Sequence, residues 1–172
     1  MKIIDVSEHQ GTIDWNQAKK SIGGVIIRAG YGQNHIDKQF IKNITECNHL
    51  EIPCGVYWFS YAYNPELAKK EAEYLIEAVK PYRVELPLAY DFEYDSVDNA
   101  KKKGVTVDKT LASDMARAFC DTIEKNNYYV INYANPDYLT NYFDEDIQTR
   151  FGLWLAQWPT IVLSTKKPPR NC

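Results

Sequence analysis

The length, composition and charge of the chain are those of a single globular domain. Of its 172 residues, 45% are hydrophobic and 25% are charged, the ordinary balance of a folded protein rather than a disordered one. The net charge of -3 at pH 7, with acidic and basic residues interspersed, gives no reason to expect nucleic acid as a partner. No apolar run approaches the roughly 20 residues of a membrane-spanning helix, so we expect no membrane insertion.

Short apolar segments alternate along the chain with segments whose apolar residues recur at helical spacing. Taken in chain order, strands are expected at residues 2–6, 24–29, 55–60, 86–92, 128–133 and 152–157. Helices are expected at residues 14–20, at 37–50 with Phe40, Ile41 and Ile44 turned inward, from Pro65 until Pro81, at 108–125, and briefly after Asn135 and Pro136. This repetition predicts an α/β fold with a helix-covered parallel sheet, either a barrel or an open sheet.

The cysteines and the first residues bear on the compartment of the protein. The cysteines form neither a metal-type pair nor a dense disulfide framework, so we expect free thiols at Cys47, Cys54, Cys120 and Cys172. The carboxylate of Asp5 falls where a secretory signal would be apolar, so no signal peptide is expected and any export would use another route.

Aromatic residues reach 13% of the chain, and many of the tyrosines gather at the ends of apolar runs. A tyrosine offers a flat apolar face and a hydroxyl, which together suit a sugar ring. A single aromatic residue is usually part of the core, but the clusters favour a binding surface.

Polar and aromatic side chains follow each predicted strand. Because the carboxyl ends of parallel strands meet at one rim of an α/β fold, these residues are expected to lie close together. They are Asp5, His9, Gln10, Arg28, Tyr31, Tyr57, Phe59, Tyr61, Asp91, Glu93, Tyr133, Asn135, Trp154, Gln157 and Trp158.

The most informative of these residues are Asp91 and Glu93, which flank Phe92. Side chains two residues apart on a strand share a face, roughly 6.5 to 7 Å apart. Like charges held close raise the proton affinity of one carboxyl, which can then donate a proton near neutral pH. Taken alone, such a pair is more often solvated or caps the next helix. Together with Asp5 and the aromatic residues, it indicates a site for glycoside hydrolysis.

Six segments spread over nearly the whole chain carry distinctive motifs. They are residues 5–11 (DVSEHQG) with 13–15 (IDW), 27–32 (IRAGYG), 55–61 (GVYWFSY), 91–93 (DFE), 133–135 (YAN) and 153–158 (LWLAQW). In this order they resemble the motifs of glycoside hydrolase family 25, the lysozymes that cut the β-1,4 bond between MurNAc and GlcNAc in peptidoglycan.

The resemblance implies an irregular (β/α) barrel of the TIM type and a muramidase activity. It makes Glu93 the general acid, with Asp91 either stabilising the transition state or orienting the N-acetyl group of the substrate as an internal nucleophile. An N-acetylated substrate favours the second role, and Asp5 would support the pair. The remaining rim residues would bind substrate. We expect no cofactor and no metal, and a monomer that acts on glycan strands at the bacterial cell wall.

One departure from the family pattern concerns the end of the chain. The family continues into a further strand region with a fourth groove aspartate, whereas no Asp or Glu follows Asp146 here. We therefore expect a barrel domain at residues 1–158 that is incomplete at its C-terminal side, followed by a divergent tail at residues 159–172.

Two other functions remain open from the sequence. Without the last carboxylate, the groove could hold sugar without cutting it and serve as a wall-binding module. Alternatively, Asp5, His9, Asp91 and Glu93 could bind a divalent ion. The second is less favoured because His35 and His49 are expected in or beside a helix, away from the rim.

Overall fold

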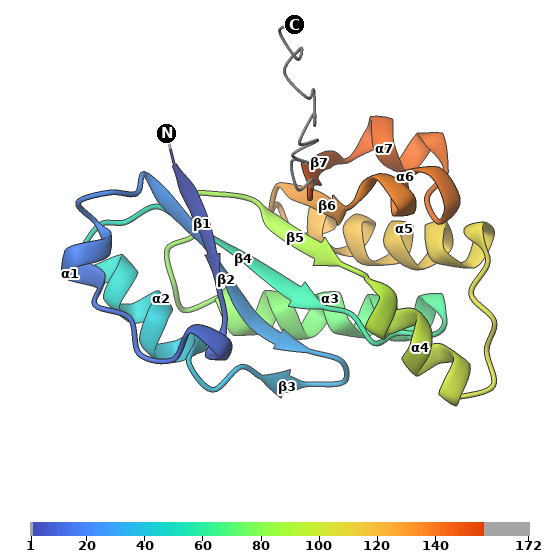
Figure 1. Cartoon of the computed structure of the whole chain (residues 1–172), viewed down its shortest axis with the longest axis horizontal. Helices are drawn as coiled ribbons and strands as arrows, with labels where there is room; N and C mark the ends of the chain where they lie inside the picture. Colours follow the sequence, from blue (N-terminus) through green and yellow to red (C-terminus); the bar gives the residue numbers. More distant parts are fainter. Residues whose placement is uncertain (1, 157–172) are drawn as a thin grey trace, which may run out of the picture.

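The computed structural model describes residues 2–156, which form a curled sheet covered by helices (Figure 1). The strands are β1 (Ile3–Val6), β2 (Gly24–Tyr31), β3 (His35–Ile36), β4 (Cys54–Phe59), β5 (Leu88–Asp91), β6 (Val130–Ala134) and β7 (Gly152–Leu155). The sheet order is β1-β2-β4-β5-β6-β7 with every neighbouring pair parallel, and β3 pairs antiparallel with β2. This is the predicted α/β fold, an incomplete (β/α) barrel.

Helices connect the strands in the manner expected of repeated βα units. They are η1 (Glu8–Gln10), α1 (Trp15–Ala18), α2 (Phe40–His49), α3 (Pro65–Val79), α4 (Tyr94–Lys102), α5 (Lys109–Lys125), α6 (Pro136–Asn141) and α7 (Glu145–Arg150). The two longest start at side-chain caps, because Asn64 accepts a hydrogen bond from the backbone of Leu67 and Asp108 accepts one from Leu111. Helices α3 and α5 pack against each other as well as against the sheet.

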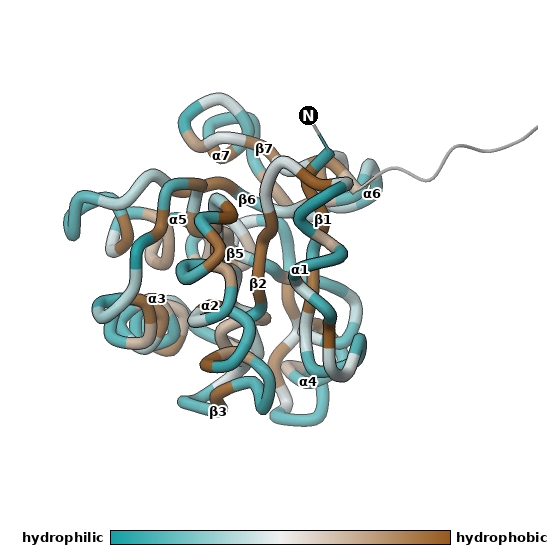
Figure 2. Tube along the Cα trace, turned by 90° about the vertical axis from the view of Figure 1, so that its left-hand side faces the viewer, coloured by the Kyte–Doolittle hydropathy of each residue, from teal (hydrophilic) through white to brown (hydrophobic). Residues whose placement is uncertain are grey.

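The two faces of the sheet differ in what they bury. On β2, Val25, Ile27 and Ala29 belong to the core shared with the helices, whereas Ile26 and Arg28 point to the concave side. Figure 2 shows β2 in brown, the colour of hydrophobic residues, with teal hydrophilic segments around it. The core therefore lies between the convex face of the sheet and the helices, which leaves the concave face free for polar chemistry.

An irregularity in β2 brings two predicted site residues to the same face. The register with β4 shifts between Arg28 and Gly30, which is the signature of a β-bulge. As a result Arg28 and Tyr31 both face the concave side although they are three positions apart, and the guanidinium lies 5.4 Å from the tyrosine ring centroid. Only glycine fits at position 30, because a Cβ there would overlap the backbone oxygen of His35 and lie 2.7 Å from the ring of Trp58.

The structure corrects several details of the predicted elements. Helices α4 and α7 and strand β3 were not expected, and the strand expected at 86–92 is shorter. Ile41, expected to point inward, is 53% exposed. In α2 the buried stripe follows Phe40, Ile44 and Cys47, so Ile41 is turned about 100° away from it. The last residue of the strand expected at 152–157 lies outside the described residues.

The described sheet ends at β1 on one side and at β7 on the other. Between these edges lies an apolar hollow of about 300 Å³, bordered by Ile3 and Asp5 on β1 and by Leu153 and Trp154 on β7. Ile3 and Leu153 are exposed. The barrel is therefore open along this line in the part of the chain that the structure describes.

Two further expectations can be compared with the described residues. Cys47, Cys54 and Cys120 are buried free thiols, as predicted, and Cys172 lies outside the described part. Across residues 2–156, no helix combines the length and the apolar character that crossing a membrane would require.

Candidate active site

A hollow of about 490 Å³ opens on the concave side of the sheet, near the carboxyl ends of the strands. We call it the central hollow. Its lining consists of Glu8, His9, Arg28, Tyr31, Tyr57, Phe59, Tyr61, Asp91, Glu93 and Asp95. A volume of this size is typical of small-ligand sites, and its lining combines carboxylates with aromatic rings.

Strand register aligns the residues at the base of this site. Tyr31 on β2 pairs with Phe59 on β4, which pairs with Asp91 on β5. Asp91 in turn pairs with Tyr133 on β6, and Tyr133 pairs with Trp154 on β7. Paired residues of a parallel sheet lie side by side on one face. A single row across five strands therefore places Asp91 between aromatic residues.

Asp91 and Glu93 reach the central hollow from one strand end, because Asp91 ends β5 and Glu93 is the residue before α4. Burial raises the pKa of Asp91 well above its usual range, and the charge of Glu93 raises it further, against the charge of Arg28. Burial also raises the pKa of Glu93, to which the charge of Asp95 contributes.

A hydrogen bond links the carboxyl groups of Asp91 and Glu93. It raises the pKa of Asp91 and lowers that of Glu93, so the two carboxyls can share one proton. Asp91 is only 6% exposed, and one of its carboxyl oxygens, Oδ1, has no hydrogen-bond partner among the described residues. The pair can thus hold one proton in a site that also admits a ligand.

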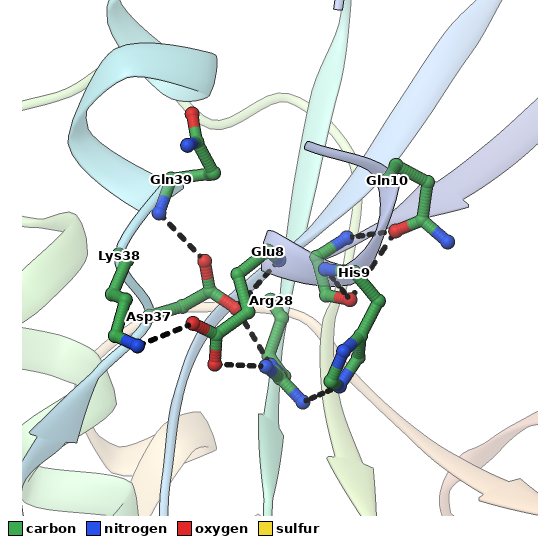
Figure 3. A network of polar contacts seen from close by, with 8 residues as sticks. Glu8, His9, Gln10, Arg28, Asp37, Lys38 and Gln39 are labelled. Carbon is green, nitrogen blue, oxygen red and sulfur yellow. Dashed lines mark hydrogen bonds and ion pairs between the residues drawn. The ribbon is translucent and has the colours of Figure 1, made fainter. Parts of the chain in front are cut away.

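Arg28 is held by a network of ion pairs at one side of the central hollow (Figure 3). Its Nε donates to Asp37 at 2.8 Å, and its Nη2 donates to Glu8 at 3.0 Å. Its Nη1 lies 3.5 Å from Nε2 of His9, and Lys38 pairs with the other carboxyl oxygen of Glu8 at 3.6 Å. Because the Asp37 side chain is fully buried, these contacts fix the guanidinium in place.

Aromatic rings form the walls of the central hollow. Tyr61 lies 5.2 Å from Phe59 and 6.3 Å from Tyr31, between ring centroids. On the other side Tyr57 packs edge-on against Trp154 at 6.2 Å. Burial is the main cause that raises the pKa of Tyr57 above its usual range, so its hydroxyl stays protonated and can donate a hydrogen bond.

Glu71, on α3, supports the aromatic wall from behind. Its carboxyl accepts hydrogen bonds from the hydroxyl of Ser60, from the backbone nitrogen of Tyr61 at 3.0 Å and from Nε2 of Gln33 at 3.3 Å. Burial raises the pKa of Glu71 to about 7, against the lowering effect of these hydrogen bonds. One buried carboxyl therefore connects the loop after β4 to the turn after β2.

Some predicted site residues lie elsewhere. Asp5 is exposed and borders the apolar hollow between β1 and β7, although its charge still contributes to raising the pKa of Asp91. Gln10 accepts hydrogen bonds from Ser7 and closes the turn around η1. Asn135 caps α6 by accepting from the backbone of Tyr138.

The predicted residues of the last two strands are only partly described. Tyr133 and Trp154 pack edge-on at 4.9 Å beside Asp91, without lining the central hollow. Burial, followed by the charges of Glu93 and Asp91, raises the pKa of Tyr133 to about 12. Gln157 and Trp158 lie outside the described residues.

Four carboxyl residues of the site region were not singled out from the sequence. Glu8 and Asp95 line the central hollow, while Asp37 and Glu71 lie behind it. Glu8 follows Ser7 inside a quoted motif, and Asp95 lies two residues after Glu93, so both were adjacent to recognised signals. Asp37 was assigned to a helix, but its carboxyl instead accepts from Arg28 and from the backbone of Gln39.

Residues 2–156 contain no cluster of metal-ligating side chains that would support the metal hypothesis. Within that range no group of three or more His, Cys, Asp or Glu side chains has an arrangement suited to a metal ion. The expected position of His35 beside a helix is wrong, because His35 lies on β3 and stacks on Tyr31 with ring centroids 5.2 Å apart. The bulge and the tight turn after β2 bring it there.

The sequence matches the family model described as glycosyl hydrolases family 25 over residues 4–168. No curated protein matches the chain in sequence. Among solved structures, the modular autolysin LytC from Streptococcus pneumoniae is 35% identical, with a TM-score of 0.67 over 80% of this chain and 33% of LytC. The chain thus spans about a third of the length of LytC.

Two further solved structures resemble the chain. A family 25 glycosyl hydrolase from Bacillus anthracis is 28% identical, with a TM-score of 0.71 over 88% of this chain and 67% of that protein. The spore cortex lytic enzyme SleM from Clostridium perfringens is 19% identical, with a TM-score of 0.75 over 96% of this chain and 55% of SleM. At that identity the second likeness concerns the fold alone.

Proposed function

The chain belongs to glycosyl hydrolases family 25, and from that membership we propose that it hydrolyses the β-1,4 bond between MurNAc and GlcNAc in peptidoglycan. The observation that carries the proposal is the proton-holding pair of Asp91 and Glu93 inside a hollow walled by aromatic rings. Glycoside hydrolysis requires an acid for the leaving oxygen and negative charge near the oxocarbenium-like transition state. This pair can supply both.

In the proposed reaction Glu93 is the general acid. The N–H of the N-acetyl group of the substrate donates a hydrogen bond to Asp91, which favours the ionised form of Asp91. The shared proton is then held by Glu93, whose carboxyl is hydrogen-bonded to that of Asp91. Glu93 donates this proton to the glycosidic oxygen as the bond to the anomeric carbon breaks.

Asp91 then acts through the substrate. Its negative charge orients the N-acetyl group, whose carbonyl oxygen attacks the anomeric carbon and forms a cyclic intermediate. Glu93, now ionised, takes a proton from water, and that water opens the intermediate. The exposed Asp5 adds negative charge from β1, since it already contributes to raising the pKa of Asp91.

The aromatic walls are proposed to bind the glycan. Tyr31, Tyr57, Phe59 and Tyr61 offer faces for sugar rings, and the guanidinium of Arg28 offers donors for hydroxyl or carbonyl groups. A structure of LytC in complex with a synthetic peptidoglycan ligand supports this choice of substrate class. We propose glycan strands at the bacterial cell wall as the partner, a monomer as the active form, and residues 1–158 as the catalytic barrel.

The test measures two quantities, the rate at which the protein clears a suspension of bacterial walls and its binding of wall glycan. We expect Glu93→Gln to reduce clearing by about 10² to 10⁴ in rate while glycan binding stays nearly unchanged. Asp98→Asn is the matched control, because Asp98 is an exposed carboxylate on the same α4 helix and does not line the central hollow. Clearing by Glu93→Gln at the wild-type rate would refute the assignment of the acid.

A wall-binding module is the second candidate function. It is favoured by one observation, the open line between β1 and β7, which leaves Asp5 and Trp154 at the borders of an apolar hollow. Aromatic walls bind sugar without needing proton transfer. Binding without clearing, by the natural chain and by Glu93→Gln alike, would decide for the module.

A further inference from the structure

A second hollow of about 330 Å³ adjoins the central hollow on the far side of its aromatic wall. We call it the distal hollow. Its lining consists of Tyr31, Gly32, Gln33, His35, Tyr61, Tyr63, Leu67, Asn99 and Lys103. Tyr31 and Tyr61 line both hollows, so a ligand in the central hollow can continue past them into the distal one.

The two hollows differ in charge. The central hollow has carboxylates at Glu8, Asp91, Glu93 and Asp95, and its cation Arg28 is already paired with Glu8 and Asp37. No aspartate or glutamate borders the distal hollow in the described residues, and its lining contains Lys103 instead. Lys103 is exposed and takes part in none of the ion pairs within the described part of the chain. A ligand with an anionic group is therefore repelled at the first hollow and accepted at the second.

The remaining lining suits an amide-bearing ligand. Tyr63 and Leu67 provide half-buried apolar surface for small side chains. The amide groups of Gln33 and Asn99 provide further donors and acceptors. Asn99 also donates to the backbone oxygen of Tyr61 at 3.0 Å, and Gln33 donates to Glu71, so both amides are held in place.

We propose that the distal hollow binds the peptide stem that the muramic acid residues of peptidoglycan carry, with a stem carboxylate paired to Lys103. This inference rests on the proposed function, since it assumes that a glycan strand occupies the central hollow. A further neutral sugar fits the lining less well, because it offers no group for the lysine charge. The distal hollow then gives the protein a preference for glycan that still carries its peptides.

The test compares two soluble glycan substrates of equal chain length, one with peptide stems and one from which an amidase has removed them. We expect the wild-type protein to have the higher kcat/KM on the stem-bearing glycan, through a lower KM. Lys103→Gln reduces that preference about two- to fivefold, as is usual for an exposed charge pair. Lys103→Glu reduces it further, and added salt weakens it in the wild type. Cleavage of the stem-free glycan stays unchanged in both variants.

Lys102→Gln is the matched control, because Lys102 is the exposed neighbour on α4 and does not line the distal hollow. Equal cleavage of both substrates by the wild type, or equal effects of Lys102→Gln and Lys103→Gln, would overturn the inference. Loss on the stem-free glycan in Lys103→Gln would assign the distal hollow to a sugar instead.

The inference and the proposed function can fail separately. If neither glycan is cleaved, the proposed function fails, and binding of the two glycans is measured by calorimetry. Tighter binding of the stem-bearing glycan, lost in Lys103→Glu and kept in Lys102→Gln, would still support the distal hollow. Equal binding of both glycans would refute it.

Discussion

Glu71 is a buried carboxyl whose ionisation makes the stability of the protein depend on pH. Its side chain has no exposed surface, and burial raises its pKa from 4.5 to about 7. In the unfolded chain the same group titrates near 4.5. The folded protein therefore binds a proton more tightly than the unfolded chain does, and stability falls as the pH rises between the two values.

The magnitude follows from the difference between the two pKa values. At about 1.4 kcal/mol per pH unit, a rise from 4.5 to about 7 corresponds to about 3 kcal/mol of stability. This contribution is fully present below pH 4.5, is lost as the pH rises through about 7, and changes no further above it. In Glu71→Gln the group cannot ionise, so this part of the pH dependence disappears.

The assay is urea unfolding of the wild type and of Glu71→Gln at several pH values from 4.5 to 8.5. We expect the difference in unfolding free energy between the two proteins to change by about 3 kcal/mol across this range, in the direction of a relatively more stable Glu71→Gln at high pH. The other titrating carboxyls cancel in that difference. Glu73→Gln, on the exposed side of the same helix, is the control and should show no such change. A difference that is constant from pH 4.5 to 8.5 would refute the reasoning.

Two further predictions concern the acid pair and the bulge. Asp95→Asn removes a charge that raises the pKa of Glu93, so the alkaline limb of the pH–rate profile should move to lower pH. Asp98→Asn is the control. A limb that does not move in Asp95→Asn would contradict the role of Glu93 as the acid. Gly30→Ala places a Cβ against the backbone oxygen of His35 and 2.7 Å from the Trp58 ring, and should lower the unfolding free energy by about 3 kcal/mol or more. Gly104→Ala, at a φ of 79° with open space around it, should lower the unfolding free energy by only about 1 kcal/mol. If urea unfolding shows equal losses in Gly30→Ala and Gly104→Ala, the close contacts at Gly30 do not destabilise the protein as argued.

Local chemistry made much of the fold predictable. Helix α3 starts at the predicted Pro65, because its cap at Asn64 and a proline at the first helical position act within one turn of the chain. Asp91 and Glu93 line one hollow as expected, because their shared direction follows from the alternation of side chains at the end of a single strand. Helix α4 was not predicted because its apolar residues are sparse, with only Ser96 and Ala100 buried along it.

Other parts of the site depend on contacts between distant segments. Strict alternation along β2 would place Arg28 and Tyr31 on opposite faces of the strand. The bulge that brings them to the same face is visible only in the pairing with β4. Glu71 lies four residues from both Leu67 and Leu75, on the apolar side of α3. That position was the available signal for a buried carboxyl, but its partners come from segments 10 and 38 residues away, which no helical pattern identifies.

The arrangement of the acid pair is independent of the open side of the barrel. The row from Tyr31 to Trp154 is fixed by hydrogen-bonded pairs among β2, β4, β5, β6 and β7, and Asp91 lies at its centre, two strands from β7. Arg28 is fixed by Glu8 and Asp37, which also lie within the described chain. Whatever closes the line between β1 and β7 acts first on the residues that border it, Asp5 and Trp154. Closure should therefore reach the acid pair chiefly through the charge of Asp5, which contributes to raising the pKa of Asp91.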